Sequence, residues 1–528
     1  MFLIANFRIM DWKQKTAIGI LVLFGVVLLM GIGVNVWIDR ALPKMLREKN
    51  RSDYAIDYKN LSYSLMDGYI KADSIEVVPK SAAANQAIKS GLYATVQSVE
   101  IKNFKIWSVL FSDRIRARSI TVTRPQIVVY KKNDKASHPK NLKKTVVAPF
   151  DKIVSVSDIY VRNADAKVVN TQTQKALLHA ANVNLQLEGI RIDDQTLDQK
   201  IPFAFDAYEF SCDSAYYQAN GFYHLTTQKI AATRDELSIG DFKLTPRYSR
   251  RAFVQKIAKE KDLFVVSAKQ IKLDRLDWGF RDTVLFAHVG SVQIDKALAD
   301  IYRAKMPPDD LSKKPLYNKL LRDLDFDLKV DTLRLRQSLL AYEEEKSFGQ
   351  GSGKLIFDRF DLTATHICSG FRQKKLPDLK IDIDCRFMAT SPMHVEWKLN
   401  VLDKSDGFNI RGRIKNVDAA RVNAFTKPYL NATTEGTLNE VFFNFTGNDV
   451  RSHGEFAIKY DDFKVTVYQQ NDRSKKNKFL TAVGNLFVKN DTKGQVKATQ
   501  VEVERIPEKS FYNFFWRNIA QGLLQIFV

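Results

Sequence analysis

The chain has 528 residues, of which 45% are hydrophobic and 27% charged, a balance typical of folded proteins that excludes a largely disordered chain. Its formal net charge of +21 points to an anionic partner, such as phospholipid headgroups, an acidic glycan or nucleic acid. The sequence carries no helix-turn-helix, zinc-finger or RNA-recognition signature, so we expect no nucleic-acid partner. Three cysteines are too few for a disulfide scaffold.

Residues 16–38 form the longest apolar stretch, which contains no charged side chain. As a helix this stretch would span roughly 34 Å, enough to cross a hydrocarbon core of about 30 Å. It is longer than the apolar part of a signal peptide, so we predict an uncleaved transmembrane anchor. Basic residues flank both ends and do not orient the anchor, because long domains translocate largely regardless of charge. The expected anchor contacts are Ile20, Leu21, Leu23, Phe24, Val27, Leu28, Leu29 and Trp37.

From residue 54 onward, apolar and polar residues alternate with a period of two, which predicts strands with one apolar face. Short helices are expected at residues 250–262, 315–321 and 417–425, and Pro125 should divide a strand in two. Strands and helices do not alternate regularly, so a parallel α/β fold is unfavourable. Residues 156–168 and 330–342 share a pattern of strand, polar turn and strand, which indicates an elongated, repetitive antiparallel sheet.

The clearest alternation lies in residues 323–336, 379–387 and 394–401. A sheet with one apolar face must cover that face, by closing, by packing on another sheet, or by curling around acyl chains. We expect a curled sheet, a groove, to be lined by Leu324, Phe326, Leu328, Val330, Leu379, Ile381, Ile383, Val395, Trp397 and Leu399.

The tail, residues 510–528, is predicted to be an amphipathic helix. Its polar residues recur every four positions, at Asn513, Arg517, Gln521 and Gln525, and Ser510 is suited to cap its start. Two roles remain open, namely a cover on the end of the sheet and a contact with a membrane or partner protein. The residues expected to make the contact are Phe511, Tyr512, Phe515, Trp516, Ile519, Leu523, Ile526 and Phe527.

The sequence offers no constellation for catalysis. The seven histidines have no helical metal-ligand spacing, and residues 349–354 fail as a phosphate loop because Phe348 stands where the first glycine is required. Acidic pairs occur in turn-like contexts, where Asp is favoured for backbone reasons. We therefore expect no catalytic residue, no metal site, no cofactor and no enzymatic activity.

Several phrases resemble the AsmA-like family of envelope proteins found in bacteria with two membranes. They are residues 119–130 (SITVTRPQIVVY), residues 436–438, Phe445 and residues 454–465 (GEFAIKYDDFKV), set in a chain with one anchor, a strand-rich body and an amphipathic tail. The resemblance implies a cytoplasmic N-terminus at residues 1–15, an inner-membrane anchor at 16–38 and a periplasmic body at 39–509 followed by the tail helix. It also implies a relationship to bridge-like lipid-transfer proteins.

These observations predict a mainly β protein of the cell envelope, anchored by one pass in the inner membrane, with the bulk of the chain periplasmic. Its β-groove would bind or transfer a phospholipid or other acyl-chain lipid in support of outer-membrane assembly. An outer-membrane or periplasmic protein is a further expected partner, at the tail helix. The alternative is a non-enzymatic structural or regulatory scaffold of the envelope with closed β-domains.

Overall fold

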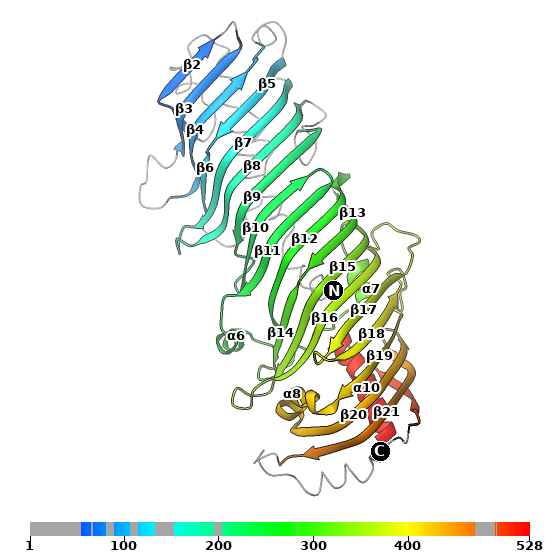
Figure 1. Cartoon of the computed structure of the whole chain (residues 1–528). Coiled ribbons are helices and arrows are strands. Elements are labelled where there is room, and N and C mark those ends of the chain that lie inside the picture. Colours follow the sequence, from blue (N-terminus) through cyan, green and yellow to red (C-terminus); the bar gives the residue numbers. More distant parts are fainter. Residues whose placement is uncertain are drawn as a thin grey trace. The chain divides into compact units, whose positions relative to one another are not determined.

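The computed structural model describes residues 54–64, 67–80, 89–105, 114–131, 153–193, 196, 203–281, 284–469, 492 and 494–527. These residues form a mainly β protein with a 22-stranded sheet and few helices (Figure 1). The chain divides into two compact units, residues 1–241 and 242–528. The predicted anchor, residues 16–38 with all of its named contacts, lies outside the described residues.

Unit 1 consists of successive strands that pair mostly with their neighbours in sequence. They are β1 (Tyr54–Asp57), β2 (Asn60–Ser64), β3 (Tyr69–Pro79), β4 (Gly91–Lys102), β5 (Arg114–Thr123), β6 (Gln126–Lys131), β7 (Ile153–Asn170), β8 (Ala176–Ile192), β9 (Ala207–Tyr217) and β10 (Tyr223–Thr233). The boundary between the units falls within β11 (Glu236–Pro246).

Unit 2 continues the same kind of strand series and adds the helices. Its strands are β12 (Asp262–Arg281), β13 (Val284–Asp295), β14 (Leu298–Ala304), β15 (Asp327–Glu345), β16 (Gly353–Cys368), β17 (Leu379–Phe387), β18 (Ser391–Leu399), β19 (Phe408–Asp418), β20 (Ala432–Gly447), β21 (Arg451–Val467) and β22 (Lys497–Glu504). The helices are α6 (Arg250–Lys256), α7 (Tyr317–Arg322), α8 (Ala419–Leu430) and α10 (Phe511–Phe527).

The prediction of a uniformly antiparallel sheet is wrong at two places. In unit 1, β5 and β6 lie end to end, pair antiparallel with β4 on one side and parallel with β7 on the other. In unit 2, β13 and β14 are related in the same way to β12 and β15. A parallel pair needs a long crossover connection, and the one in unit 2 occupies residues 305–326; residues 132–152, between β6 and β7, lie outside the described part.

The two strand series repeat each other in detail. The divided strand of unit 1 breaks at Arg124, beside Pro125 as predicted, and that of unit 2 breaks at Lys296; both residues have left-handed backbones, with φ of 47° and 50°. The Arg124 N–H donates to the Arg162 carbonyl at 2.8 Å, and the Lys296 N–H donates to the Arg336 carbonyl at 2.9 Å. Residue 162 lies in β7 at the position that 336 occupies in β15, so the predicted repeat extends to the backbone hydrogen bonds.

The two series also share a bulge. Between β7 and β8 the register shifts on either side of Ala164, and between β15 and β16 it shifts on either side of Ser338. In unit 1 the Asn184 side chain accepts from the Asn163 N–H at 3.0 Å; in unit 2 the Asp361 carboxylate accepts from the Gln337 N–H at 2.7 Å. A bulge bends a strand and increases its twist, so both series are bent at the same place.

Unit 1 buries its apolar face in one cluster. Ile120, Val122, Ile159, Val161 and Val183 are each 0–2% exposed. They alternate with polar residues along β5, β7 and β8, as the period of two predicts.

Three element boundaries differ from the sequence predictions. The helix expected at residues 250–262 ends at Lys256, because Ile257 is extended and leads toward β12. The strand expected at 323–336 begins only at Asp327, because Asp323 closes α7 by donating its N–H to the Lys319 carbonyl. Leu324 and Phe326 therefore lie in the turn before β15. The helix expected at 417–425 is α8, which begins later because Asp418 caps it.

Candidate functional site

The apolar face of the unit 2 sheet is continuous from strand to strand. Two rows of residues follow the register across neighbouring strands. The first row contains Leu273, Val292, Leu333, Ala364, Ile381, Trp397, Ile410 and Phe445. The second contains Ile271, Ile294, Leu335, Leu362, Ile383, Val395, Gly412 and Phe443.

Exposure changes along these rows. All six members on β12, β13 and β15 are aliphatic and only half-buried. Farther along, Ile381, Trp397 and Phe445 are buried, with exposures of 2%, 6% and 1%. The same face is therefore partly open to solvent at one end and covered at the other.

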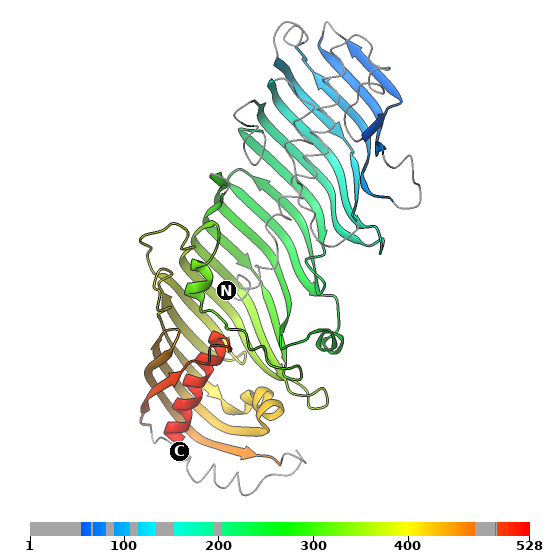
Figure 2. The same cartoon turned by 180° about the vertical axis from the view of Figure 1, so that it is seen from behind.

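Helix α10 makes the cover at the far end, where it lies across β18–β21 (Figure 2). The Phe511 ring stacks on Trp397 with centroids 4.4 Å apart, and it meets Phe408 edge-on at 5.1 Å. Phe515 meets Phe443 at 5.1 Å. Aromatic pairs in such geometries add to the free energy gained from burial, so α10 is firmly seated on the sheet.

The residues of α10 that face the sheet are not all among those predicted to make the contact. Phe514 and Asn518 are each 1% exposed, and neither was among the expected contacts. The Asn518 side chain accepts from the Ser452 hydroxyl at 2.8 Å and donates to the Phe514 carbonyl at 2.9 Å, so burial leaves it hydrogen-bonded. Gly522 permits close approach, because a Cβ there would lie 2.4 Å from the Phe456 ring.

The eight predicted contact residues of the tail are divided between two sides of α10. Phe511 is buried, whereas Phe515, Ile519, Leu523 and Ile526 are half-buried. Tyr512 and Trp516 are 39% and 49% exposed. The side chain of Phe527 lies outside the described part. Of the two roles left open by the sequence, the structure shows the cover on the sheet.

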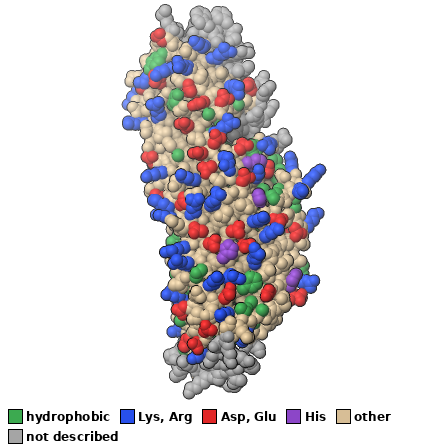
Figure 3. Space-filling view, turned by 45° about the vertical axis from the view of Figure 1, so that its right-hand side comes forward, with side chains coloured by type: hydrophobic (Ala, Val, Ile, Leu, Met, Phe, Trp, Pro, Cys, Tyr) green, Lys and Arg blue, Asp and Glu red, His purple; other side chains and the backbone are tan. Residues whose placement is uncertain are grey.

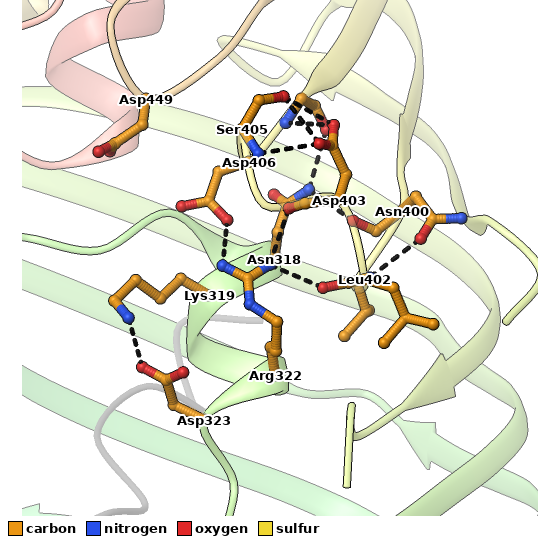
Figure 4. A network of polar contacts seen from close by, with 12 residues as sticks. Asn318, Lys319, Arg322, Asp323, Asn400, Leu402, Asp403, Ser405, Asp406 and Asp449 are labelled. Carbon is orange, nitrogen blue, oxygen red and sulfur yellow. Dashed lines mark hydrogen bonds and ion pairs between the residues drawn. The ribbon is translucent and has the colours of Figure 1, made fainter. Parts of the chain in front are cut away.

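Helix α7 is the second cover and is held by a polar network (Figure 4). Its Arg322 donates to the carbonyls of Val401 and Asp403, both at 2.8 Å, and to the Asp406 carboxylate at 2.7 Å. Asn318, which is 1% exposed, donates to the carbonyls at positions 400 and 407, both at 2.9 Å. These bonds fix α7 against the turn between β18 and β19, where Tyr317 meets Trp397 with centroids 5.2 Å apart.

The crossover before α7 is also tied to the segment before α10. The Lys314 N–H donates to the Pro507 carbonyl at 2.8 Å, and Lys509 pairs with Asp309 at 2.5 Å. Arg505, whose side chain is fully buried, bonds to Asp449 and to the Lys314 carbonyl. The two covers are thus joined to each other as well as to the sheet.

The predicted groove-lining residues do not share one environment, and Leu324 and Phe326 lie in the turn before β15. Leu328 is half-buried, like the aliphatic rows of β12–β15. Val330, Leu379, Ile381, Val395, Trp397 and Leu399 are buried, and Leu324, Phe326 and Ile383 are half-buried. Aromatic side chains of α7 and α10 cover the buried part of the face. Alternation along single strands could not predict this contact, because it does not show which elements pack together.

A charged border closes the apolar face near the ends of β12, β14 and β15. Arg303 donates to both oxygens of Asp262, at 2.6 and 2.8 Å, in a bidentate pair. Tyr342 donates to Glu344 at 2.5 Å, and burial, followed by the neighbouring Glu344, raises the pKa of Tyr342 far above its usual range. The tyrosine stays a neutral donor, so this border is a satisfied ion-pair network.

Within the described ranges, the metal-ligating and nucleophilic residue types are placed as follows. No group of three His, Cys, Asp or Glu among them is placed to hold a metal ion. Cys212, Cys368 and Cys385 are buried and free, and burial raises the pKa of Cys385 to about 12, which keeps the thiol protonated. None of the helices in the described part has the length and apolarity to cross a membrane.

Comparison with known proteins adds no relative. No protein-family model matches the chain, and no curated protein is significantly similar to it.

Proposed function

We propose that this chain is a non-enzymatic envelope protein of the AsmA-like kind, anchored in the inner membrane by residues 16–38, whose sheet forms a groove for phospholipid. Acyl chains would lie on the apolar face of β12, β13 and β15, and the protein would pass or hold lipid in support of outer-membrane assembly. The observation that carries the proposal is the pair of half-buried aliphatic rows on these strands.

The half-buried rows leave apolar side chains partly in contact with water, which is energetically unfavourable. Six aliphatic side chains in adjacent positions expose apolar surface in an otherwise folded sheet, and such patches mark binding sites. Equivalent residues of unit 1 are buried: Ile159 and Val161 are each 1% exposed, whereas Leu333 and Leu335 of unit 2 are half-buried. An acyl chain along the rows would remove apolar surface from water at about 25 cal/mol per Å².

The alternative is an envelope scaffold with closed β-domains. It is favoured by the buried face of unit 1 and by the α10 cover in unit 2, since both show that this chain can fill an apolar face with its own side chains. The two proposals differ in what contacts the half-buried rows of β12, β13 and β15: a lipid in the first, other parts of the same chain in the second.

Site-specific cross-linking tests the proposal. A photoreactive benzoylphenylalanine is placed at Leu333, on the apolar face, or at the adjacent exposed Arg334, on the polar face, in the full chain expressed in a bacterium with two membranes. Because neighbouring residues of a strand point to opposite faces, phospholipid adducts are expected from position 333 and not from 334. Mass spectrometry of the purified chain identifies the adduct.

Equal lipid adducts from both positions would indicate detergent-like, unspecific contact and would contradict the groove. Absence of lipid adducts at 333, with cross-links only to other parts of the same chain, would favour the closed scaffold. Thermal unfolding of both labelled chains controls for damage to the sheet.

A further inference from the structure

The polar face of unit 2 carries a hollow over β16–β20, of about 730 Å³. Its lining brings together five cationic side chains and only two carboxylates, Asp384 and Glu396. The face drawn in Figure 3 shows the usual surface pattern, with both signs of charge interspersed. The excess of cations in one hollow departs from that pattern, and it points to an anion.

Ion pairs account for two of the five cations. Arg411 lies 2.5 Å from Glu396, and Arg413 lies 2.9 Å from Glu440. Within the described ranges, Arg359, Arg386 and Lys415 have no carboxylate at ion-pair distance. These three cations thus make no ion pair within the described ranges, although Asp358 and Glu440 are the Cα partners of Arg386 and Lys415 on the neighbouring strands.

The register places two of these cations around a gap. Arg386 is the Cα partner of Pro392, and the pairing of Met393 with Ile414 places Lys415 on the other side of Pro392. The backbones of β17 and β19 lie two strand spacings apart, about 10 Å. Proline has a short, apolar side chain, so the space above it can hold an anion that receives hydrogen bonds from both neighbours.

Unit 1 carries uncharged residues at two of these positions. By the shared register, Asn182 of unit 1 stands where Arg359 stands in unit 2, and both have left-handed backbones, with φ of 50° and 45°. Ala181 pairs with Ser214 as Asp358 pairs with Arg386, so Ser214 stands where Arg386 stands. Asn182 donates to Asp213 at 2.7 Å, whereas Arg359 has no carboxylate at ion-pair distance within the described ranges.

We propose that this hollow binds the phosphate group of a phosphate ester. Arginine matches phosphate because its planar fork donates two parallel hydrogen bonds to the oxygens. Phe442 and Pro392 supply apolar lining for a small organic group, and the volume lies within the range of small-molecule sites. The same chemistry occurs in lipid headgroups and in soluble phosphate esters. The site lies on the face opposite the aliphatic rows and does not depend on the lipid groove.

The test uses the full chain in detergent micelles and two probes, glycerol 3-phosphate by calorimetry and phosphatidylglycerol added to the micelles. The double variant R359N/R386D replaces two cations of the hollow by an amide and a carboxylate, and we expect its affinity for the recognised probe to fall at least about tenfold, since two charge-assisted contacts are lost. The matched control, Arg334→Gln, removes an exposed arginine outside the hollow and should bind like the wild type.

Binding of glycerol 3-phosphate that is lost in R359N/R386D supports the site with a soluble source. Binding of phosphatidylglycerol alone, weakened in the same variant, supports a lipid headgroup. Equal affinity of R359N/R386D and the unaltered chain, or no binding of either probe, overturns the proposal. If the double variant unfolds, R359Q/R386Q replaces it, and retained lipid cross-linking at position 333 separates a failure here from a failure of the groove.

Discussion

The series β4–β9 of unit 1 and β12–β17 of unit 2 share a strand break and the bulge at Ala164 and Ser338, but their side chains differ in exposure and charge. Ile120 and Val122 are 2% and 0% exposed, whereas Val292 and Ile294, at the equivalent positions, are half-buried. On the polar face, Arg359 stands at the position of Asn182, which donates to Asp213 in unit 1. The backbone of the repeat is thus fixed by alternation and a few left-handed residues, while binding properties are free to change at side chains.

The largest effect should come from placing a charge on the covered part of the apolar face. Ile381→Asp puts a carboxylate at a position that is 2% exposed, and we expect it to cost about 4 kcal/mol or more and to unfold β16–β19. Leu333→Asp, in the same row but half-buried, should keep the fold and weaken lipid binding. Hydrogen exchange followed by mass spectrometry locates the unfolding.

Asp382→Asn, one residue from Ile381 on the exposed face, is the control for Ile381→Asp and should leave exchange unchanged. If Ile381→Asp and Leu333→Asp were equally destabilising, the distinction between an open and a covered part of the face would fail.

A smaller effect is expected at the shared bulges. Asn184→Ala and Asp361→Ala each remove the acceptor for one bulge N–H, at 3.0 and 2.7 Å respectively. Each should lower stability by about 1 kcal/mol or less, and the Asp361 change should cost more because a charged acceptor makes the stronger bond. Thermal denaturation of the single variants ranks them; a larger loss at Asn184 would contradict this.

The smallest effect concerns pH. The hydrogen bond from His394 to Asp384, at 2.9 Å, together with Glu396, raises the pKa of His394 above its usual value against a modest opposing effect of burial. Its stabilising ion pair is complete below about pH 6.5 and is lost as the pH rises through the raised pKa. Phosphate-ester binding should weaken over the same interval, since a cation in the hollow is lost, and His394→Gln should flatten that dependence in calorimetric titrations.

Much of the sheet was predictable because half-buried strands alternate apolar and polar residues in the sequence with a period of two. Residues 379–387 were predicted to be a strand from alternation alone, and β17 has those bounds. The tail helix was predicted from its four-residue spacing, and α10 follows it. Single-strand alternation says nothing about which strands pair, so the parallel pairs needed the structure. The repeat that aligns Val156 with Val330 was predicted from the shared pattern of the two segments.

The candidate sites were less accessible from sequence. Asn518 and Gly522 were not among the predicted contacts of the tail, yet they allow α10 to approach the sheet. Arg359, Arg386 and Lys415 are far apart in sequence and exposed, so the sequence alone gives no reason to group them. Only the pairing of the strands shows that they line the same hollow. Long-range pairing, rather than local propensity, determines both features.

The position of α10 in the chain has a consequence for biosynthesis. The aromatic side chains that it covers, such as Trp397, Phe408 and Phe443, belong to strands that leave the ribosome first. Until Phe511 and the following turns have been made, this face has no cover from α10, and a nascent chain presents a broad aromatic surface. Chains interrupted before Phe511 keep that surface, which makes them substrates for chaperones and proteases.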